Sequence, residues 1–326
     1  MPTTTATAPI SLYRETAVYE RERERIFARS WQLLGIEGDM ARSGDYLADL
    51  VAGYPVMVVR DERGGLQGYH NVCRHRAGPL VGEAKGRCDG EIVCRIHQWR
   101  YAYDGRLKAA TGFGPADDFD VAASGLLPIR VETWRGLVFV NLDSAAEPLA
   151  TLIGPLEARF DRVSHRSARV RHRHPVACNW KVYVESFLDG FHLETQDETH
   201  RPDVRMHGEV ALHAETSAAS APDSLWAWIW PNLGVTIYRG VLLLEHMRPD
   251  GPDRMQIDHI FLHAPEDPGV DAAIHASEHV TEDRAWDCER IQQNLDAGVY
   301  RQGVLSPTSE AAVAWFQDHV IGALAD

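Results

Sequence analysis

Two short matching stretches in the first half of the chain decide the fold: CRH from Cys73 to His75 and, after eighteen residues, CRIH from Cys94 to His97. Each stretch carries one cysteine and one histidine, and each lies among short apolar runs and turn residues. We expect each to form a tight loop between β segments, so that four ligands converge. Two thiolates and two imidazoles at one place indicate a metal cofactor.

Two kinds of metal site use these residue types. A structural Cys2His2 zinc site is one, but zinc sites usually place both cysteines in one half and both histidines in the other. Here each half is mixed, which favours a two-iron two-sulfur Rieske cluster with two cysteines on one iron and two histidines on the other. Such a cluster suits an electron relay. Cys88, Cys178 and Cys288 are interpreted as small buried apolar side chains.

Composition and charge limit the remaining possibilities. The chain has 326 residues, 44% hydrophobic and 25% charged, which predicts an ordinary globular protein of two domains. The formal net charge of -14 argues against a nucleic-acid partner. The longest apolar runs fall far short of the ~20 residues that span a bilayer, and MPTTTATAP lacks the features of a signal peptide. We therefore expect a cytoplasmic protein without a membrane segment.

Turn signals and apolar patterns predict an α+β protein with an all-β domain first. The expected domains are a helical lead-in at 1–40, a Rieske domain at 41–148 and a catalytic domain at 149–326. The β domain is expected between 44 and 141, and later strands at 169–175 and within 226–263. Helices are expected at 11–34, 149–160, 179–193, 278–297 and 308–324, the last capped at 306–308.

A second candidate site lies in NWKVYVESFLDGFH, which ends at His192. On a helix, Glu185, Asp189 and His192 fall on one stripe. An O2-activating non-heme iron typically binds two histidines and one carboxylate. His192 is the first candidate ligand, and His200, in a loop that precedes a proline, is the second.

The carboxylate of this site is expected from the late helix. Asp283 is the first choice, and Glu282 and Asp287 are the alternatives. Taken singly, each of these residues also fits a solvated helix face. The prediction of an iron site rests on the neighbouring cluster, whose electrons need an acceptor.

At this point the chain resembles the Rieske non-heme iron oxygenases, the family of aromatic-ring hydroxylating oxygenases and of choline or betaine monooxygenases. The resemblance is carried by ERIFARSW at 24–31, both cluster stretches, NWK at 179–181 and CERIQ at 288–292. It implies an N-terminal Rieske domain, a C-terminal helix-grip catalytic domain and a homotrimer in which one subunit's cluster reduces its neighbour's iron.

The resemblance also implies roles for single residues. His192 resembles the family's first iron ligand, and Asp189 resembles an acidic bridge to a cluster histidine across the subunit interface. The family usually places the second histidine five residues after the first, where this chain has Asp197, and His200 fits a loop three residues longer. Asp283 aligns with the family's carboxylate only within about a residue.

The implied activity is the use of O2 and externally supplied electrons to hydroxylate, with possible demethylation, a small organic substrate. No Gly-rich dinucleotide motif follows a strand, so we expect a separate NAD(P)H reductase or ferredoxin as electron donor. A Rieske electron-transfer protein is the alternative from another class. Roughly 180 residues beyond the cluster domain argue against it.

The substrate is suggested by aromatic residues. Trp226, Trp228 and Trp230 alternate along a predicted strand and share one face, where Phe191 and Tyr238 could complete a cage for a quaternary ammonium group. Ordinary core packing of a sheet is the alternative. The PNL at 231–233 looks more like the choline and betaine branch, which favours a quaternary-ammonium monooxygenase over an aromatic-ring dioxygenase.

Overall fold

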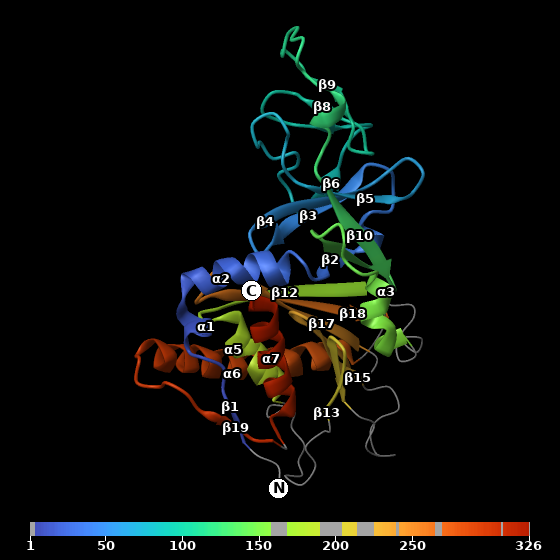
Figure 1. The fold of residues 1–326 in the computed structure, drawn as a ribbon. Helices are drawn as coiled ribbons and strands as arrows, with labels where there is room; N and C mark the ends of the chain where they lie inside the picture. Colours follow the sequence, from blue (N-terminus) through green and yellow to red (C-terminus); the bar gives the residue numbers. More distant parts are fainter. Residues whose placement is uncertain are drawn as a thin grey trace. The chain divides into compact units, whose positions relative to one another are not determined.

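The computed structural model describes residues 4–157, 168–189, 204–213, 225–238, 241–264, 269–307 and 309–325. The sequence predictions for Phe191, His192, Asp197 and His200 lie outside the described residues. The chain divides into two compact units, a cluster unit of Phe27–Ala150 and a catalytic unit in which Met1–Ile26 joins Thr151–Asp326 (Figure 1).

The cluster unit is built from antiparallel strands, which confirms the β domain predicted between 44 and 141. Its large sheet has seven strands in the order β2-β11-β10-β5-β4-β3-β6, and a small sheet has the order β7-β8-β9. The strands of the large sheet are β2 (Gln32–Ile36), β3 (Asp45–Val51), β4 (Tyr54–Arg60), β5 (Leu66–His70), β6 (Lys85–Arg87), β10 (Pro128–Trp134) and β11 (Leu137–Asn141). Those of the small sheet are β7 (Ile92–Val93), β8 (Arg100–Tyr101) and β9 (Leu107–Ala109).

The predicted lead-in helix at 11–34 is only partly correct. The structure has two short helices, α1 (Ser11–Arg14) and α2 (Thr16–Glu22), and a π-helical turn, η1 (Arg23–Phe27). The end of the predicted helix is instead strand β2, which pairs with β11. The buried pairing with β11 overrides the local helical pattern at Gln32–Leu34.

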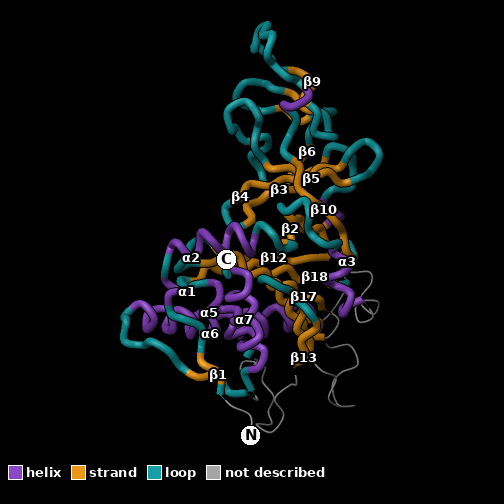
Figure 2. Tube along the Cα trace, viewed as in Figure 1, coloured by secondary structure: helices purple, strands orange, loops and turns teal. Residues whose placement is uncertain are grey.

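The catalytic unit contains a second antiparallel sheet of seven strands, in the order β12-β18-β17-β16-β15-β14-β13. The predicted α+β class is therefore confirmed. Figure 2 shows helices of this unit, in purple, beside the orange strands. The strands are β12 (Ala168–Val176), β13 (Val204–His207), β14 (Val210–His213), β15 (Leu225–Ile229), β16 (Leu233–Tyr238), β17 (Val241–Pro249) and β18 (Met255–His263).

The helices of the catalytic unit are α5 (Trp180–Leu188), α6 (Val270–Asp296) and α7 (Ala311–Leu324). Asn179 caps α5, because its side chain accepts a hydrogen bond from the Lys181 amide. Helix α6 begins at Val270, ahead of the predicted 278, and α7 begins after Glu310, beyond the predicted cap at 306–308. A short helix α3 (Leu149–Ile153) is followed by a 3-10 turn η4 (Gly154–Leu156). Near the two ends of the chain, strand β1 (Thr5–Ala6) pairs with β19 (Val304–Leu305).

Candidate metal centres

The two cluster loops have the same backbone conformation. The Cys73 carbonyl accepts from the Ala77 amide at 3.1 Å, and the Cys94 carbonyl accepts from the Gln98 amide at 3.0 Å. Ala77 and Gln98, each four residues after its cysteine, have positive φ angles of 56° and 59°. Residues other than glycine rarely adopt positive φ angles, and two of them do so here at matching positions. Such backbone strain is typical of functional sites.

These loops bring the predicted cluster ligands together. Cys73 and Cys94 are buried, and their thiols contact each other. The imidazole rings of His75 and His97 lie edge to face, with centroids 4.6 Å apart, and His75 stacks on Trp99. Sequence reasoning therefore named four side chains that the fold gathers at one end of the small sheet.

The residues present fit a Rieske cluster. Nδ1 of His75 is buried and has no hydrogen-bond partner among the described residues, as expected of a nitrogen that binds metal. The hydroxyl of Tyr101 lies 3.1 Å from Sγ of Cys73, and burial raises the pKa of that thiol. A two-iron cluster requires two protein ligands for each iron, and the paired thiols and paired imidazoles match this requirement.

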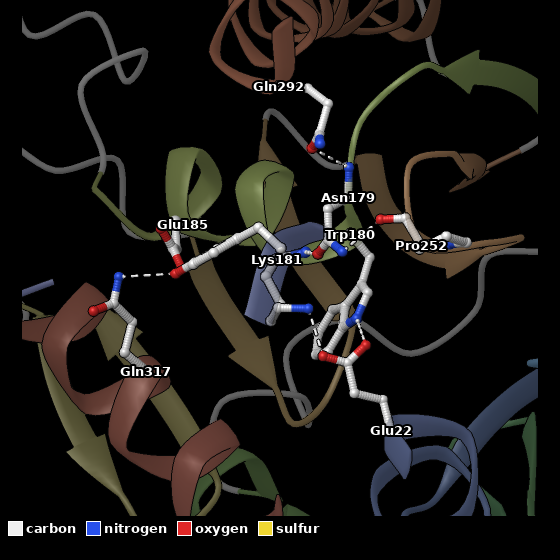
Figure 3. Close-up of polar contacts among 9 residues, drawn as sticks. Glu22, Asn179, Trp180, Lys181, Glu185, Pro252, Gln292 and Gln317 are labelled. Atoms are coloured by element: carbon white, nitrogen blue, oxygen red, sulfur yellow. Dashed lines mark hydrogen bonds and ion pairs between the residues drawn. The ribbon is translucent and has the colours of Figure 1, made fainter. Parts of the chain in front are cut away.

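The NWK motif at the start of α5 positions the helix. Figure 3 shows the Asn179 amide N–H donating to Gln292 of α6 at 3.0 Å, and the Asn179 side chain donating to the Pro252 carbonyl at 2.6 Å. Trp180 Nε1 donates to Glu22 of α2 at 2.9 Å, and the Lys181 ammonium pairs with the same carboxylate. The motif thus connects α5 to α2, to α6 and to the turn after β17.

Two predicted acidic residues of α5 line one cavity. Glu185 accepts a 2.6 Å hydrogen bond from the Tyr13 hydroxyl, and burial raises its pKa to about 7. Asp189 lies at the C-terminal cap of α5, where its amide donates to the Glu185 carbonyl. Both line a cavity of about 620 Å³, which Ser186 and Asp287 also line. Among the three carboxylates considered for the iron, Asp287 is the one that shares this cavity with Asp189.

The first choice for the iron carboxylate lies on the outer side of α6. The Asp283 side chain is 62% exposed, and its Oδ2 lies 3.7 Å from Nε2 of His279. Glu282 is exposed as well. The assignment of Asp283 as an iron ligand stays a prediction. Its exposed position does not support that role, because a ligand of a buried metal has to face the interior.

Sequence reasoning missed the residue that does turn inward. Arg284 is 5% exposed, and its Nη1 lies 3.2 Å from Oε1 of Glu245 and 3.4 Å from the Tyr183 hydroxyl. The Tyr183 hydroxyl also donates to Glu245, at 2.7 Å. Burial acts to raise the pKa of Glu245, but Arg284 and His259 outweigh it and hold that pKa at about 2. The spacing of Thr281, Arg284, Cys288, Gln292 and Leu295, three or four residues apart, was the signal that could have found this buried face.

The tryptophans of β15 and the following turn belong to the core. Trp226 stacks on Phe187 of α5 with ring centroids 5.0 Å apart. Trp228 meets Trp315 and Phe316 of α7 edge to face, and Trp230 also contacts Phe316. These contacts support core packing over the aromatic cage for the described residues; the Tyr238 side chain and Phe191 lie outside them.

Two family models match separate parts of the chain. The Rieske [2Fe-2S] domain matches residues 30–122, and the ring hydroxylating alpha subunit (catalytic domain) matches residues 196–326. The first range includes all four predicted cluster ligands, and the second includes α6 and α7. Together the two domains imply a Rieske cluster and a mononuclear iron. A second domain of this kind also separates the chain from a simple electron carrier.

Individual relatives extend the similarity along the chain. The chloroplastic choline monooxygenase of Spinacia oleracea is 28% identical over 332 residues, covering 91% of this chain and 73% of that protein. The glycine betaine monooxygenase oxygenase subunit of Chromohalobacter salexigens is 35% identical over 193 residues, covering 56% of this chain and 41% of that protein. The crystal structure of the apo quaternary ammonium Rieske monooxygenase CntA has a TM-score of 0.84 at 24% identity, covering 99% of this chain and 96% of the other, which shows a shared fold.

No helix within the described ranges is long and apolar enough to cross a membrane. The matched cluster loops, the two consecutive domain models and the long alignment with choline monooxygenase agree with one another. The chain therefore belongs to the Rieske non-heme iron oxygenases, a family of oxidoreductases.

Proposed function

We propose that this chain is the oxygenase component of a Rieske system that hydroxylates a small quaternary ammonium compound, with demethylation where the hydroxylated carbon is an N-methyl group. The observation that carries the proposal is the alignment with choline monooxygenase over 91% of the chain, which includes both the cluster loops and the catalytic unit. The partial similarity to a glycine betaine monooxygenase subunit supports the same substrate class.

The proposed roles begin with the cluster. Cys73 and Cys94 would hold one iron, and His75 and His97 the other; when bound, the cluster supplies one-electron transfer. His97 is exposed, which supports an approach of redox partners to the cluster from the side of this residue. Tyr101 and Trp99 hold Cys73 and His75 in place through a hydrogen bond and a ring stack.

The remaining site roles also belong to the proposal. Asp189 is assigned to couple a neighbouring subunit's cluster to the iron, because a metal-bound imidazole commonly donates its second N–H to a carboxylate. Its place in the cavity at the end of α5 supports this assignment. His192 and His200 stay predicted ligands of the mononuclear Fe(II), the group that supplies O2 activation when bound.

The partners and location follow from the family. We propose a separate NAD(P)H reductase or a ferredoxin as electron donor, and a homotrimer as the assembly. The predicted cytoplasmic location is part of the same proposal. A ring-hydroxylating dioxygenase of aromatic compounds is the second candidate, which the family name of the catalytic domain favours.

The test is reconstitution with a generic reductase, NADH and O2, against choline, glycine betaine, carnitine, naphthalene and an aromatic acid. We expect NADH and O2 consumption that depends on a quaternary ammonium compound, with formaldehyde or a hydroxylated product in proportion. Cys73→Ser serves as the background control. Oxidation of the aromatic compounds alone would establish the second candidate. If a preparation that holds all its metals reduces and reoxidises the cluster but forms no product, the chain would be an electron carrier.

A further inference from the structure

A long loop of the cluster unit carries two phenylalanines. Residues 110–127, all within the described part of the chain, connect β9 to β10 with no regular element except the 3-10 turn η3 (Ala122–Ser124) (Figure 1). This segment is named the aromatic loop for Phe113 and Phe119. Most connections have about 5 residues, and much longer ones without a helix or strand often serve a function.

Two hydrogen bonds attach the aromatic loop to the two cluster loops. The Thr111 hydroxyl donates to the Gln98 carbonyl at 2.8 Å, and Nη2 of Arg74 donates to the Ala123 carbonyl at 3.4 Å. Gln98 follows the second CRIH stretch directly, and Arg74 lies within the first CRH stretch. The aromatic loop is therefore held beside the proposed cluster ligands near both of its ends.

Aromatic rings connect a proposed cluster ligand to the surface of this loop. His75 stacks on Trp99 with ring centroids 4.8 Å apart. Trp99 in turn meets Phe113 and Phe119 edge to face, each at 5.7 Å. Trp99 is buried, whereas Phe113 is 42% exposed. Two ring contacts thus lead from a proposed iron ligand to a side chain that a partner protein can touch.

The surface of the aromatic loop combines apolar and acidic side chains. Val121 is exposed like Phe113. Asp117 and Asp118, which lie between these two in the sequence, are exposed and form no ion pair with another described residue. Transient electron-transfer contacts are small, and charge complementarity around an apolar contact makes their association fast and specific.

The cluster loops carry the opposite charge. Arg74, Arg76 and Arg95 are exposed there. A partner with a basic surface is therefore attracted to the aspartates of the aromatic loop and repelled by the cluster loops. Under the proposed function the cluster exchanges electrons with an external donor and with a neighbouring subunit's iron, so it needs a separate side for each.

We propose that the aromatic loop is the docking surface for the external electron donor, and that the donor meets it with an apolar contact surrounded by basic side chains. In each encounter the donor loses one electron and the cluster gains it. The inference rests on the proposed function, which requires such a donor, and adds where the donor binds and which charge it carries there.

The experiment follows electron exchange of the cluster in the full chain without any substrate. Ferric cytochrome c, a basic one-electron protein that stands in for the basic donor, is mixed with the reduced chain in a stopped-flow instrument. We expect its second-order rate constant to fall as salt is added, because salt screens attraction between opposite charges. A reduced, acidic plant-type ferredoxin, mixed with the oxidised chain, should react faster as salt is added.

Charge variants locate the contact, because the whole chain is acidic and salt dependence alone does not identify a site. Asp118→Lys should slow the reaction with cytochrome c about tenfold at low salt, and the difference should disappear at high salt. Glu62→Lys makes the same change of charge at an exposed turn of the same unit and is the matched control. It should change the rate constant little.

An apolar variant tests the ring contact. Phe113→Ala should slow the reaction about tenfold at low and at high salt, because it removes an aromatic anchor rather than a charge. Leu50→Ala, at an exposed apolar residue of β3, is its control. Reduction by dithionite, a small reagent that needs no docking surface, should be the same in every variant.

Equal rate constants for Asp118→Lys and Glu62→Lys overturn the inference, and so does a ferredoxin reaction that slows as salt is added. A changed oligomeric mass in Asp118→Lys also overturns it, because the loop would then contact another copy of the chain. If Phe113→Ala loses the cluster spectrum, Asp118→Lys decides alone. A chain that meets every expectation here yet oxidises none of the compounds tested counts against the proposed function and not against this docking surface.

Discussion

Lys181 of α5 and Glu22 of α2 form an ion pair that is almost completely buried, although 159 positions separate them in the sequence. Glu22 also accepts a hydrogen bond from the Trp180 indole (Figure 3). The pair fixes the N-terminal helices to the catalytic unit. A buried pair of this kind costs little while it is complete, but loss of one partner leaves an uncompensated charge.

Lys181→Met is therefore expected to destabilise the catalytic unit by about 3–5 kcal/mol. The measurement is urea unfolding followed by circular dichroism. Glu22→Gln combined with Lys181→Met should recover most of the loss, because no buried charge is then left alone. A single variant within about 1 kcal/mol of wild type would contradict the importance of the pair.

Cys73→Ser should abolish the visible absorption of the cluster, because it removes one of only four protein ligands. Cys88→Ser is the matched control, since Cys88 is a half-buried cysteine of the same unit outside both loops. Iron, sulfide and the absorption spectrum of the two variants are compared. An unchanged spectrum for Cys73→Ser would refute the ligand assignment.

Glu185 should make the stability of the catalytic unit depend on pH. Burial raises its folded-state pKa from 4.5 to about 7, so the folded protein binds the proton more tightly than the unfolded chain does. The stabilisation is complete below about pH 4.5 and is lost as the pH rises through about 7, with a total of up to about 3 kcal/mol. Glu185→Gln should remove this contribution, so that the variant becomes the more stable form at pH 8. Urea unfolding of both proteins from pH 5 to 8 tests this; parallel curves would show that Glu185 titrates normally.

Asp189→Ala should leave the cluster spectrum and the oligomeric mass unchanged and slow the passage of electrons from cluster to iron by orders of magnitude. The reduced protein, in the form that carries a mononuclear iron, is mixed with substrate and O2, and the cluster absorption is followed in a single turnover. Glu310→Ala, which removes another carboxylate from the lining of the same cavity, is the control for a general change of charge there. Wild-type reoxidation in Asp189→Ala would return this residue to an ordinary helix-capping role.

The cluster loops could be predicted from sequence because the four proposed ligands lie within 25 consecutive residues and the chemistry of each residue type is specific. Strand β2 could not, because its pairing with β11 depends on residues 137–141, about a hundred positions away. The choice of Asp283 failed to find structural support for a similar reason. Composition marks the acidic residues of α6, but only the rotation of the helix against α5 decides that Arg284 faces inward.

The catalytic unit draws its residues from both ends of the chain, with the cluster unit inserted between Ile26 and Thr151. During synthesis, the segment that carries Glu22 leaves the ribosome long before its partner Lys181 exists. The contiguous cluster unit can acquire its sheet meanwhile, whereas α1 and α2 must wait for α5 to emerge. The ion pair that closes the catalytic unit therefore also sets the order of assembly, and a ribosome-bound chain that stops before residue 181 should expose the N-terminal helices to protease.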